Sequence, residues 1–129
     1  MHFSVTILGS GSALPTKRRN PTSQYVDCNG RHILIDCGEG TQLQIRKFGV
    51  KLQRIDYILI SHLHGDHYFG LIGLLSSMHL LGRIKPISIY GPKGLKEIIE
   101  IQLNYAKSTL GFELHFFVLD AKSNGCFFE

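Results

Sequence analysis

The amino-acid sequence lacks an apolar run long enough to cross a membrane. Its longest apolar stretch, from Tyr68 to Leu81, is interrupted by glycine, serine and histidine and is typical of a buried helix. Because the first residues enter an alternating strand pattern directly, we expect no signal peptide. Internal repeats, linkers and low-complexity segments are also missing, and 129 residues suit one domain. These absences predict a single domain with no membrane partner.

Cysteine is scarce, and no C-x-x-C pair occurs among the three cysteines, which are Cys28, Cys37 and Cys126. Cys28 and Cys37 flank a predicted hairpin whose turn, Asn29-Gly30, favours the type I′ conformation. That turn places Cys28 opposite Arg31 and leaves Cys37 well beyond it, so a disulfide between them is not expected. We therefore expect buried free thiols and a cytoplasmic location.

Acidic residues are outnumbered by basic ones, which gives a net charge of +4 and a pI near 9.1. This balance permits a polyanionic partner but does not require one. The consecutive residues Lys17, Arg18 and Arg19 concentrate the charge in a loop predicted between residues 10 and 23. The run is therefore either a nucleic-acid contact or a solvated basic turn.

Hydrophobic periodicity predicts an α/β layered domain. Strands are expected at residues 3–8, 24–28, 31–37, 55–60, 87–90 and 112–119, and helices at 40–48, 68–81 and 95–106. In the first of these helices we expect Leu43 and Ile45 to point inward. The segments 33–35 and 55–60 are apolar on both faces, so each predicts a covering layer on both sides, of which the helices supply one.

Three imidazoles and a carboxylate follow the predicted strand at 55–60 directly: His62, His64, Asp66 and His67. Imidazole nitrogen and carboxylate oxygen are ligands that zinc and other divalent metals prefer. A loop at a strand end is also where α/β proteins build their sites. The pattern H-x-H-x-D-H arises by chance about once in a thousand chains of this composition. It therefore predicts a metal site rather than a histidine-rich surface turn.

This segment resembles the H-x-H-x-D-H signature of the metallo-β-lactamase superfamily, and Asp36 resembles the first motif of that superfamily. The loop Pro15-Thr16-Lys17-Arg18-Arg19-Asn20 is similar to the P-x-K-x-R-N loop of the ribonuclease Z family. Residues 8–11, 35–42 and 90–94 are similar to that family too. The resemblance runs from about residue 5 to residue 95.

The resemblance implies an αββα sandwich, and residues 1–129 would supply about its first half, as the amino-terminal part of one domain. It also implies a zinc-dependent endoribonuclease that removes the 3′ trailer from precursor tRNA and leaves a 3′-hydroxyl. The complete protein would be a homodimer. It would hold two zinc ions, the first bound by His62 and His64 and the second by Asp66 and His67.

The resemblance assigns further roles around these ions. Asp66 would also handle the proton of the attacking water, and Asp36 would orient a metal-bound histidine rather than bind metal itself. On physical grounds, beside the resemblance, we expect Lys17 and Arg19 to neutralise phosphates near the cut and Asn20 to read or position a nucleotide edge.

Two alternatives stay open: another phosphodiesterase or hydrolase of this superfamily, and a half-domain without catalysis. The family uses a further histidine, an aspartate and a final histidine that cannot be placed here, and neither His115 nor Asp120 lies in a recognisable motif. The turn signal Asn124-Gly125 precedes Cys126-Phe127-Phe128, which has the pattern of a strand opening, so we expect a truncated chain. We expect the isolated histidines to be structural: His32, His79 and His115.

Overall fold

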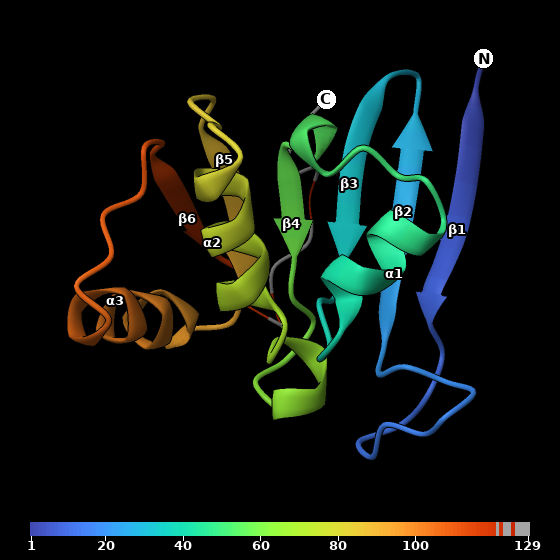
Figure 1. Ribbon diagram of the computed structural model, residues 1–129, viewed down its shortest axis with the longest axis horizontal. Coiled ribbons are helices and arrows are strands. Elements are labelled where there is room, and N and C mark those ends of the chain that lie inside the picture. The colour runs from blue at the N-terminus through green and yellow to red at the C-terminus, as the bar shows by residue number, and fades with distance from the viewer. Residues whose placement is uncertain (121, 123–124, 126–129) are drawn as a thin grey trace.

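The computed structural model describes residues 1–120, 122 and 125, and in them a six-stranded sheet has the order β1-β2-β3-β4-β5-β6 (Figure 1). The strands are β1 (Phe3–Gly9), β2 (Ser23–Cys28), β3 (Arg31–Ile35), β4 (Tyr57–Leu59), β5 (Ile87–Gly91) and β6 (Leu114–Val118). The helices are α1 (Thr41–Lys47), α2 (Leu71–Leu80) and α3 (Leu95–Tyr105), with short 3-10 helices η1 (Leu52–Arg54) and η2 (Gly65–His67). No helix in these residues combines the length and apolar character that a membrane span requires.

The sheet is antiparallel over β1, β2 and β3 and parallel from β3 to β6. The predicted hairpin is confirmed: Asn29 and Gly30 both have positive φ, and Cys28 pairs with Arg31. Cys28 and Cys37 are free thiols, as expected. Cys37 is buried as predicted, whereas Cys28 is only partly buried, and Cys126 lies outside the described residues. Because β3 to β6 run in one direction, their carboxyl ends share one edge of the sheet (Figure 1).

The core lies between the sheet and its helices. Leu34, Ile58 and Ile89 pair in register across the parallel strands, and each is fully buried. Ile45 of α1 and Leu74 of α2 join the same cluster. Parallel strands added in one direction by right-handed crossovers place every connecting helix on one face of the sheet, and Figure 1 shows α1 and α2 on that face.

The other face of the sheet carries a second apolar row. Ile7, Ile35, Leu59, Tyr90 and Phe117 align across the strands on this face, with Gln24 between the first two. Ile7 is 52% exposed and Phe117 is 46% exposed, although both are large apolar side chains. The apolar side of β1 therefore faces away from the helices, and the expected helical layer on one face of the sheet is confirmed.

Several expected features differ in detail. Leu43 is 68% exposed, so its inward placement was wrong, whereas Ile45 is buried as predicted. Residues two apart on a helix point in nearly opposite directions, and a helix as short as α1 covers the core with one side only. The predicted strand at 31–37 ends earlier because Asp36 has φ 58. The expected return strand at 126–128 lies outside the described residues.

The three isolated histidines have local partners, in line with the structural role expected of them. His32 hydrogen-bonds to Tyr25, and His79 Nδ1 accepts a hydrogen bond from the backbone amide of Gly111. His115 lies 2.8 Å from a carboxylate oxygen of Glu113.

Candidate metal centre

Two adjacent parallel strands end at the candidate site. Asp36 follows β3 directly, and Ser61 follows β4 after one intervening residue. The backbone amide of Ser61 donates to Oδ1 of Asp36 at 2.8 Å, and its hydroxyl donates to Oδ2 at 3.0 Å. Parallel pairing of β3 with β4 thus brings together two side chains that are 25 residues apart in the sequence.

The loop from residue 61 to residue 70 is tied to the turn after β3 by its backbone. The amide of Cys37 donates to the carbonyl of His67 at 2.8 Å, and the amide of Gly70 donates to the carbonyl of Cys37 at 2.9 Å. A Cβ atom at Gly70 would lie 2.1 Å from the carbonyl oxygen of Gly38, so a side chain at residue 70 would displace one of the two segments. The histidine loop therefore has a fixed position.

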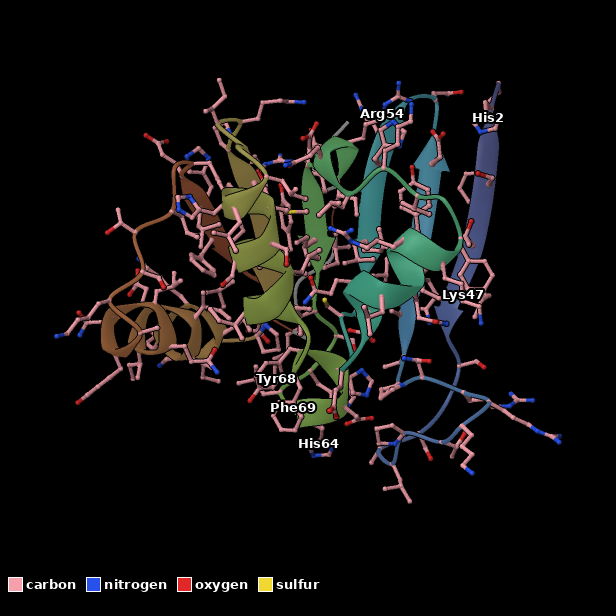
Figure 2. The ribbon with its side chains drawn as sticks, in the orientation of Figure 1. His2, Lys47, Arg54, His64, Tyr68 and Phe69 are labelled. Atoms are coloured by element: carbon pink, nitrogen blue, oxygen red, sulfur yellow. The ribbon has the colours of Figure 1, made fainter. Side chains whose placement is uncertain are left out.

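The four predicted metal ligands lie close together on this loop. The ring centroids of His62 and His67 are 3.8 Å apart, and those of His62 and His64 are 4.7 Å apart. Oδ2 of Asp66 lies 3.3 Å from Nε2 of His67. His62 and His64 are exposed, whereas Asp66 and His67 are partly buried. Figure 2 shows His64 and Phe69 together, at the end of the molecule where β3 and β4 terminate.

The donor types suit a divalent metal, but the number of donors for each ion is small. Imidazole and carboxylate are the groups that zinc binds. Within residues 1–120, 122 and 125, no three histidine, cysteine, aspartate or glutamate side chains are grouped so that they would hold one ion. The residues present therefore fit part of a metal site and not a complete one.

Cys37 follows Asp36 in the sequence and bonds the histidine loop through its backbone, but its thiol is unsuited to metal binding. Its side chain is fully buried, and this burial raises the pKa of the thiol from 9.0 to about 12. A thiol must lose its proton to ligate a metal or to act as a nucleophile. Cys37 is therefore a packed core residue at neutral pH.

Asp36 makes several hydrogen bonds at the base of the cluster. It is 5% exposed, and Oδ2 lies 2.7 Å from Nδ1 of His67 in addition to its two contacts with Ser61. Both carboxylate oxygens therefore have donors within the protein. Since Nδ1 of His67 faces Asp36, Nε2 is the ring nitrogen of His67 that stays available to a metal.

The basic loop packs against the same turn. A Cβ at Gly38 would lie 2.6 Å from Cβ of Pro21 and 2.7 Å from the carbonyl oxygen of Asp66. A Cβ at Gly40 would lie 2.6 Å from the side-chain nitrogen of Asn20. The structure therefore brings both Asn20 and the histidine loop against one short glycine-containing turn.

The two basic residues singled out from the sequence lie further out on this loop. Lys17 is exposed, and Arg19 donates from Nη1 to the hydroxyl of Ser10 at 3.3 Å. The backbone amide of Thr16 donates to the carbonyl of Arg19 at 3.0 Å, which closes the loop into a turn. This turn lies at the same end of the molecule as the histidine loop (Figure 1).

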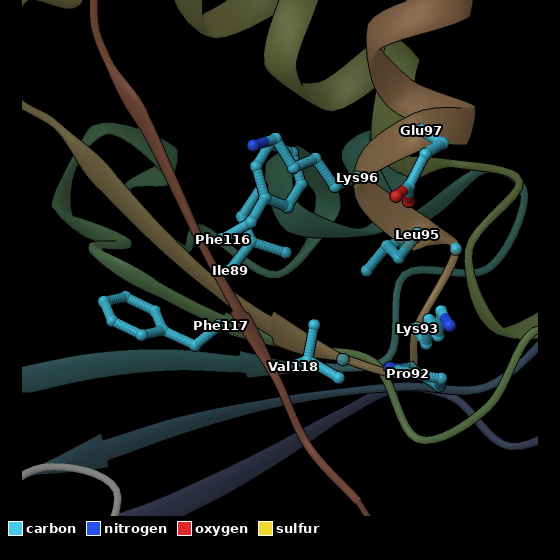
Figure 3. A pocket seen from close by; sticks show the side chains of 11 residues that line it. Ile89, Pro92, Lys93, Leu95, Lys96, Glu97, Phe116, Phe117 and Val118 are labelled. Atoms are coloured by element: carbon cyan, nitrogen blue, oxygen red, sulfur yellow. The ribbon is translucent and has the colours of Figure 1, made fainter.

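A hollow lies between the start of α3 and strands β5 and β6 (Figure 3). Apolar residues such as Leu95 and Phe116 line it together with Lys93, Lys96 and Glu97. None of the four predicted metal ligands lines this hollow, so it is separate from the histidine cluster. The two regions touch at one point, because a Cβ at Gly94 would lie 3.3 Å from Cδ1 of Leu63.

Sequence reasoning assigned no role to Ser61, although this residue contacts three members of the site. Its hydroxyl lies within hydrogen-bonding distance of Asp36, His62 and His67. Its position directly before His62 is the only sequence signal, and a serine there has no distinctive pattern.

Comparison with known proteins gives the family. A family model described as "Anti-Pycsar protein Apyc1" matches residues 3–116. Similar curated proteins include Ribonuclease Z of Bacteroides fragilis, 46% identical over 127 residues, and Ribonuclease Z of Cytophaga hutchinsonii, 48% identical over 120 residues. These alignments cover 98% and 93% of this chain but 42% and 38% of the relatives. The chain thus spans about two fifths of the length of the curated relatives it matches.

Comparison with solved structures also finds tRNase Z proteins and the metallo-β-lactamase fold. Human tRNase Z, short form, superposes with a TM-score of 0.81 at 43% identity, over 91% of this chain and 46% of that one. A long form RNase Z from yeast gives a TM-score of 0.70 at 27% identity, over 93% of this chain and 19% of that one. The metallo-beta-lactamase fold protein YhfI from Bacillus subtilis, at 20% identity and a TM-score of 0.70 over 94% of this chain and 46% of that one, shares the fold. The chain therefore has the amino-terminal half of the metallo-β-lactamase fold, is homologous to ribonuclease Z, and belongs to the family described as Anti-Pycsar protein Apyc1.

Proposed function

We propose that this chain is the amino-terminal part of one metallo-β-lactamase-fold domain that removes the 3′ trailer from precursor tRNA. The reaction is hydrolysis of a phosphodiester bond that leaves a tRNA 3′-hydroxyl. One observation carries the proposal: the basic loop and the histidine loop pack on the same turn, with Pro21 and the Asp66 carbonyl both against Gly38. A cationic surface and a cluster of metal-binding side chains then face one substrate phosphate. The names of the relatives support the choice of tRNA.

In this proposal the histidine loop binds two zinc ions in the complete protein. His62 and His64 hold one ion, and Asp66 and His67 hold the other. Bound zinc supplies Lewis-acid stabilisation of charge at the scissile phosphate. Because the described residues offer no set of three donors to one ion, the remaining ligands would come from other parts of the complete protein.

The chain's own residues position the substrate and move a proton. A carboxylate oxygen of Asp66 accepts the proton of the attacking water, a role that suits a partly buried carboxylate next to His67. Asp36 holds His67 through Nδ1 and does not bind metal. Lys17 and Arg19 neutralise phosphates, and Asn20 positions a nucleotide beside the turn at residues 38–40. The complete protein acts in the cytoplasm as a homodimer.

Cleavage of a 3′-extended precursor tRNA by the complete protein tests the function. We expect zinc-dependent cutting just after the discriminator nucleotide, with a 3′-hydroxyl on the tRNA and a 5′-phosphate on the trailer. The same tRNA without the 3′ extension is the matched control and should stay uncut. Cleavage at unrelated RNA sites, or no cleavage with added zinc, would count against this function.

Two other functions are favoured by specific observations. The family model bears the description of an anti-Pycsar protein rather than of a ribonuclease, which favours a substrate other than precursor tRNA for a phosphodiesterase or hydrolase of this superfamily. Hydrolysis of a simple phosphodiester such as bis(p-nitrophenyl) phosphate, without cleavage of precursor tRNA, would support that reading. The absence of a three-donor metal group within residues 1–120, 122 and 125 favours a half-domain without catalysis. A folded 129-residue chain that turns over neither substrate would support this third interpretation.

A further inference from the structure

We propose that Ser61 is a positioning residue, which holds the ring of His62 with Nδ1 protonated so that Nε2 is free for a metal. The proposal rests on the proposed function in one respect only, namely that His62 is a metal ligand. The hydrogen-bond geometry on which it depends is present in the chain without any ion.

Ser61 is the residue in which the contacts of the cluster converge. Its hydroxyl oxygen lies 3.0 Å from Oδ2 of Asp36, 3.2 Å from Nδ1 of His62 and 3.0 Å from Nδ1 of His67. Its backbone amide separately donates to Oδ1 of Asp36 at 2.8 Å. The strand end is therefore fixed by the backbone, and the hydroxyl adds contacts that a backbone amide cannot make.

The inventory of donors and acceptors sets the direction of each bond. An ionised carboxylate only accepts hydrogen bonds, so the single proton of the Ser61 hydroxyl points to Asp36. The oxygen of Ser61 then offers lone pairs alone to the ring of His62. A ring nitrogen that faces a lone pair must carry a hydrogen, which makes Nδ1 of His62 the protonated nitrogen.

The same arrangement repeats at His67 with a different acceptor. Nδ1 of His67 lies closer to Oδ2 of Asp36, at 2.7 Å, than to Ser61. Asp36 therefore controls His67 directly, and it controls His62 through Ser61. A single buried carboxylate orients two metal-binding rings, one of them by way of a hydroxyl.

The hydrogen bond from His62 to Ser61 sets the tautomer of the ring before a metal binds, and this should raise metal affinity. The tautomer of a neutral imidazole follows the hydrogen bond that its ring makes, and loss of such a partner lowers metal affinity by about ten- to a hundredfold. Ser61→Ala removes the hydroxyl but keeps the backbone amide that ties β4 to Asp36. Ser61→Thr keeps both groups. This pair of variants separates the role of the hydroxyl from a purely structural one.

The test reads the tautomer of His62 in the complete protein, labelled with 15N-histidine and stripped of metal. Long-range 1H–15N imidazole spectra at pH 8, where ordinary imidazoles are neutral, distinguish the two tautomers. We expect the Nδ1–H tautomer in the wild type and in Ser61→Thr, and a shift toward the Nε2–H tautomer in Ser61→Ala. Ser76→Ala is the matched control, because the Ser76 hydroxyl bonds the Ile72 carbonyl within α2.

A zinc competition titration on the same four proteins gives the second readout. We expect Ser61→Ala to bind zinc about ten- to a hundredfold more weakly, and Ser61→Thr and Ser76→Ala to match the wild type. An unchanged His62 tautomer in Ser61→Ala, or failure of threonine to restore the wild-type spectrum, would overturn the proposal. The spectra need neither zinc nor RNA. A protein that cuts no precursor tRNA yet shows the tautomer shift would therefore refute the proposed function and leave this inference standing.

Discussion

Nδ1 of His67 lies 2.7 Å from Oδ2 of Asp36, although 31 residues separate the two in the sequence. Both residues lie just beyond the carboxyl end of a parallel strand. Asp36 follows β3, and His67 lies on the loop after β4. Parallel strands share this edge, and the backbone bonds between Cys37 and the loop hold the two segments together. The pair therefore orients the ring of His67 before any metal arrives.

Removal of the charge on Asp36 should weaken metal binding while the loop stays in place. In Asp36→Asn an amide nitrogen or oxygen faces Nδ1 of His67, so the ring loses its charged acceptor. We expect about ten- to a hundredfold lower zinc affinity in the complete protein, measured by competition with a chromophoric chelator. Asp27→Asn is the control, because Asp27 pairs with His2 at the start of the chain. Unchanged zinc affinity in Asp36→Asn would show that this hydrogen bond does not orient a ligand.

Asp66→Ala should abolish cleavage of precursor tRNA by the complete protein. The side chain is proposed both to hold an ion and to accept a proton, so a loss of about a thousandfold or more is expected. RNA binding, measured by gel shift, should stay within a few fold, because the proposed phosphate contacts come from Lys17 and Arg19 and not from Asp66. A variant that keeps a tenth of the wild-type rate would remove Asp66 from the reaction.

Lys17→Ala and Arg19→Ala should weaken the binding of precursor tRNA more than they slow its cleavage. Each lost phosphate contact should reduce the slope of log K against log salt by about one. Lys51→Ala serves as the control, since Lys51 is an exposed lysine on the segment before η1. Equal salt slopes for the loop variants, the control and the wild type would favour a solvated basic turn.

The sequence predicted the order of the strands and of the longer helices, because this order depends on local patterns. The turn at Asn29-Gly30 and the four donors at residues 62–67 are signals that act within a few residues. The prediction that Leu43 points inward was wrong, because a short helix offers two plausible apolar positions and only packing selects one of them. Alternation in β1 likewise distinguishes two faces but does not say which one the helices cover.

The role of Ser61 could not be predicted for a different reason. Its partner Asp36 lies 25 residues away, and their contact follows from the parallel pairing of β3 with β4. Periodicity in the sequence predicts both strands but does not predict that they are neighbours. The ligand set shows the same limit, since the sequence supplies four donors and leaves open how they share the ions.

Burial of Cys37 predicts a loss of stability at alkaline pH. The pKa of this thiol is raised from 9.0 to about 12 by burial, so above pH 9 the unfolded chain releases a proton that the folded chain retains. The folded state then binds more protons, and the contribution to the free energy of unfolding falls by about 1.4 kcal/mol per pH unit between these values. Urea unfolding of the wild type and Cys37→Ala at pH 8 to 10.5 should show their difference shrinking as pH rises. A difference that stays constant would contradict this, and the partly buried Cys28 provides the matched Cys28→Ala control.

The isolated 129-residue chain should self-associate because one face of its sheet is apolar and uncovered by helices. Phe3, Val5 and Ile7 of β1 are 63%, 48% and 52% exposed, and Phe117 adds a ring at the other end of the face. Soluble monomers rarely expose contiguous apolar patches above a few hundred Å². Light scattering at tens of micromolar should therefore report dimers or larger species.

Polar substitution on the open face should reduce this association without loss of the fold. Val5→Thr and Ile7→Thr keep the β-branched shape that suits a strand, so β1 should still pair with β2. Leu43→Thr is the matched control, because Leu43 is also apolar and is more exposed than either β1 residue, but lies on α1, on the helical side of the sheet. We expect the double β1 variant to shift the chain toward monomer and the α1 variant to leave the distribution unchanged. A wild-type chain that stays a cooperatively unfolding monomer at these concentrations would show that the open face is stable in water, and that it needs no second layer.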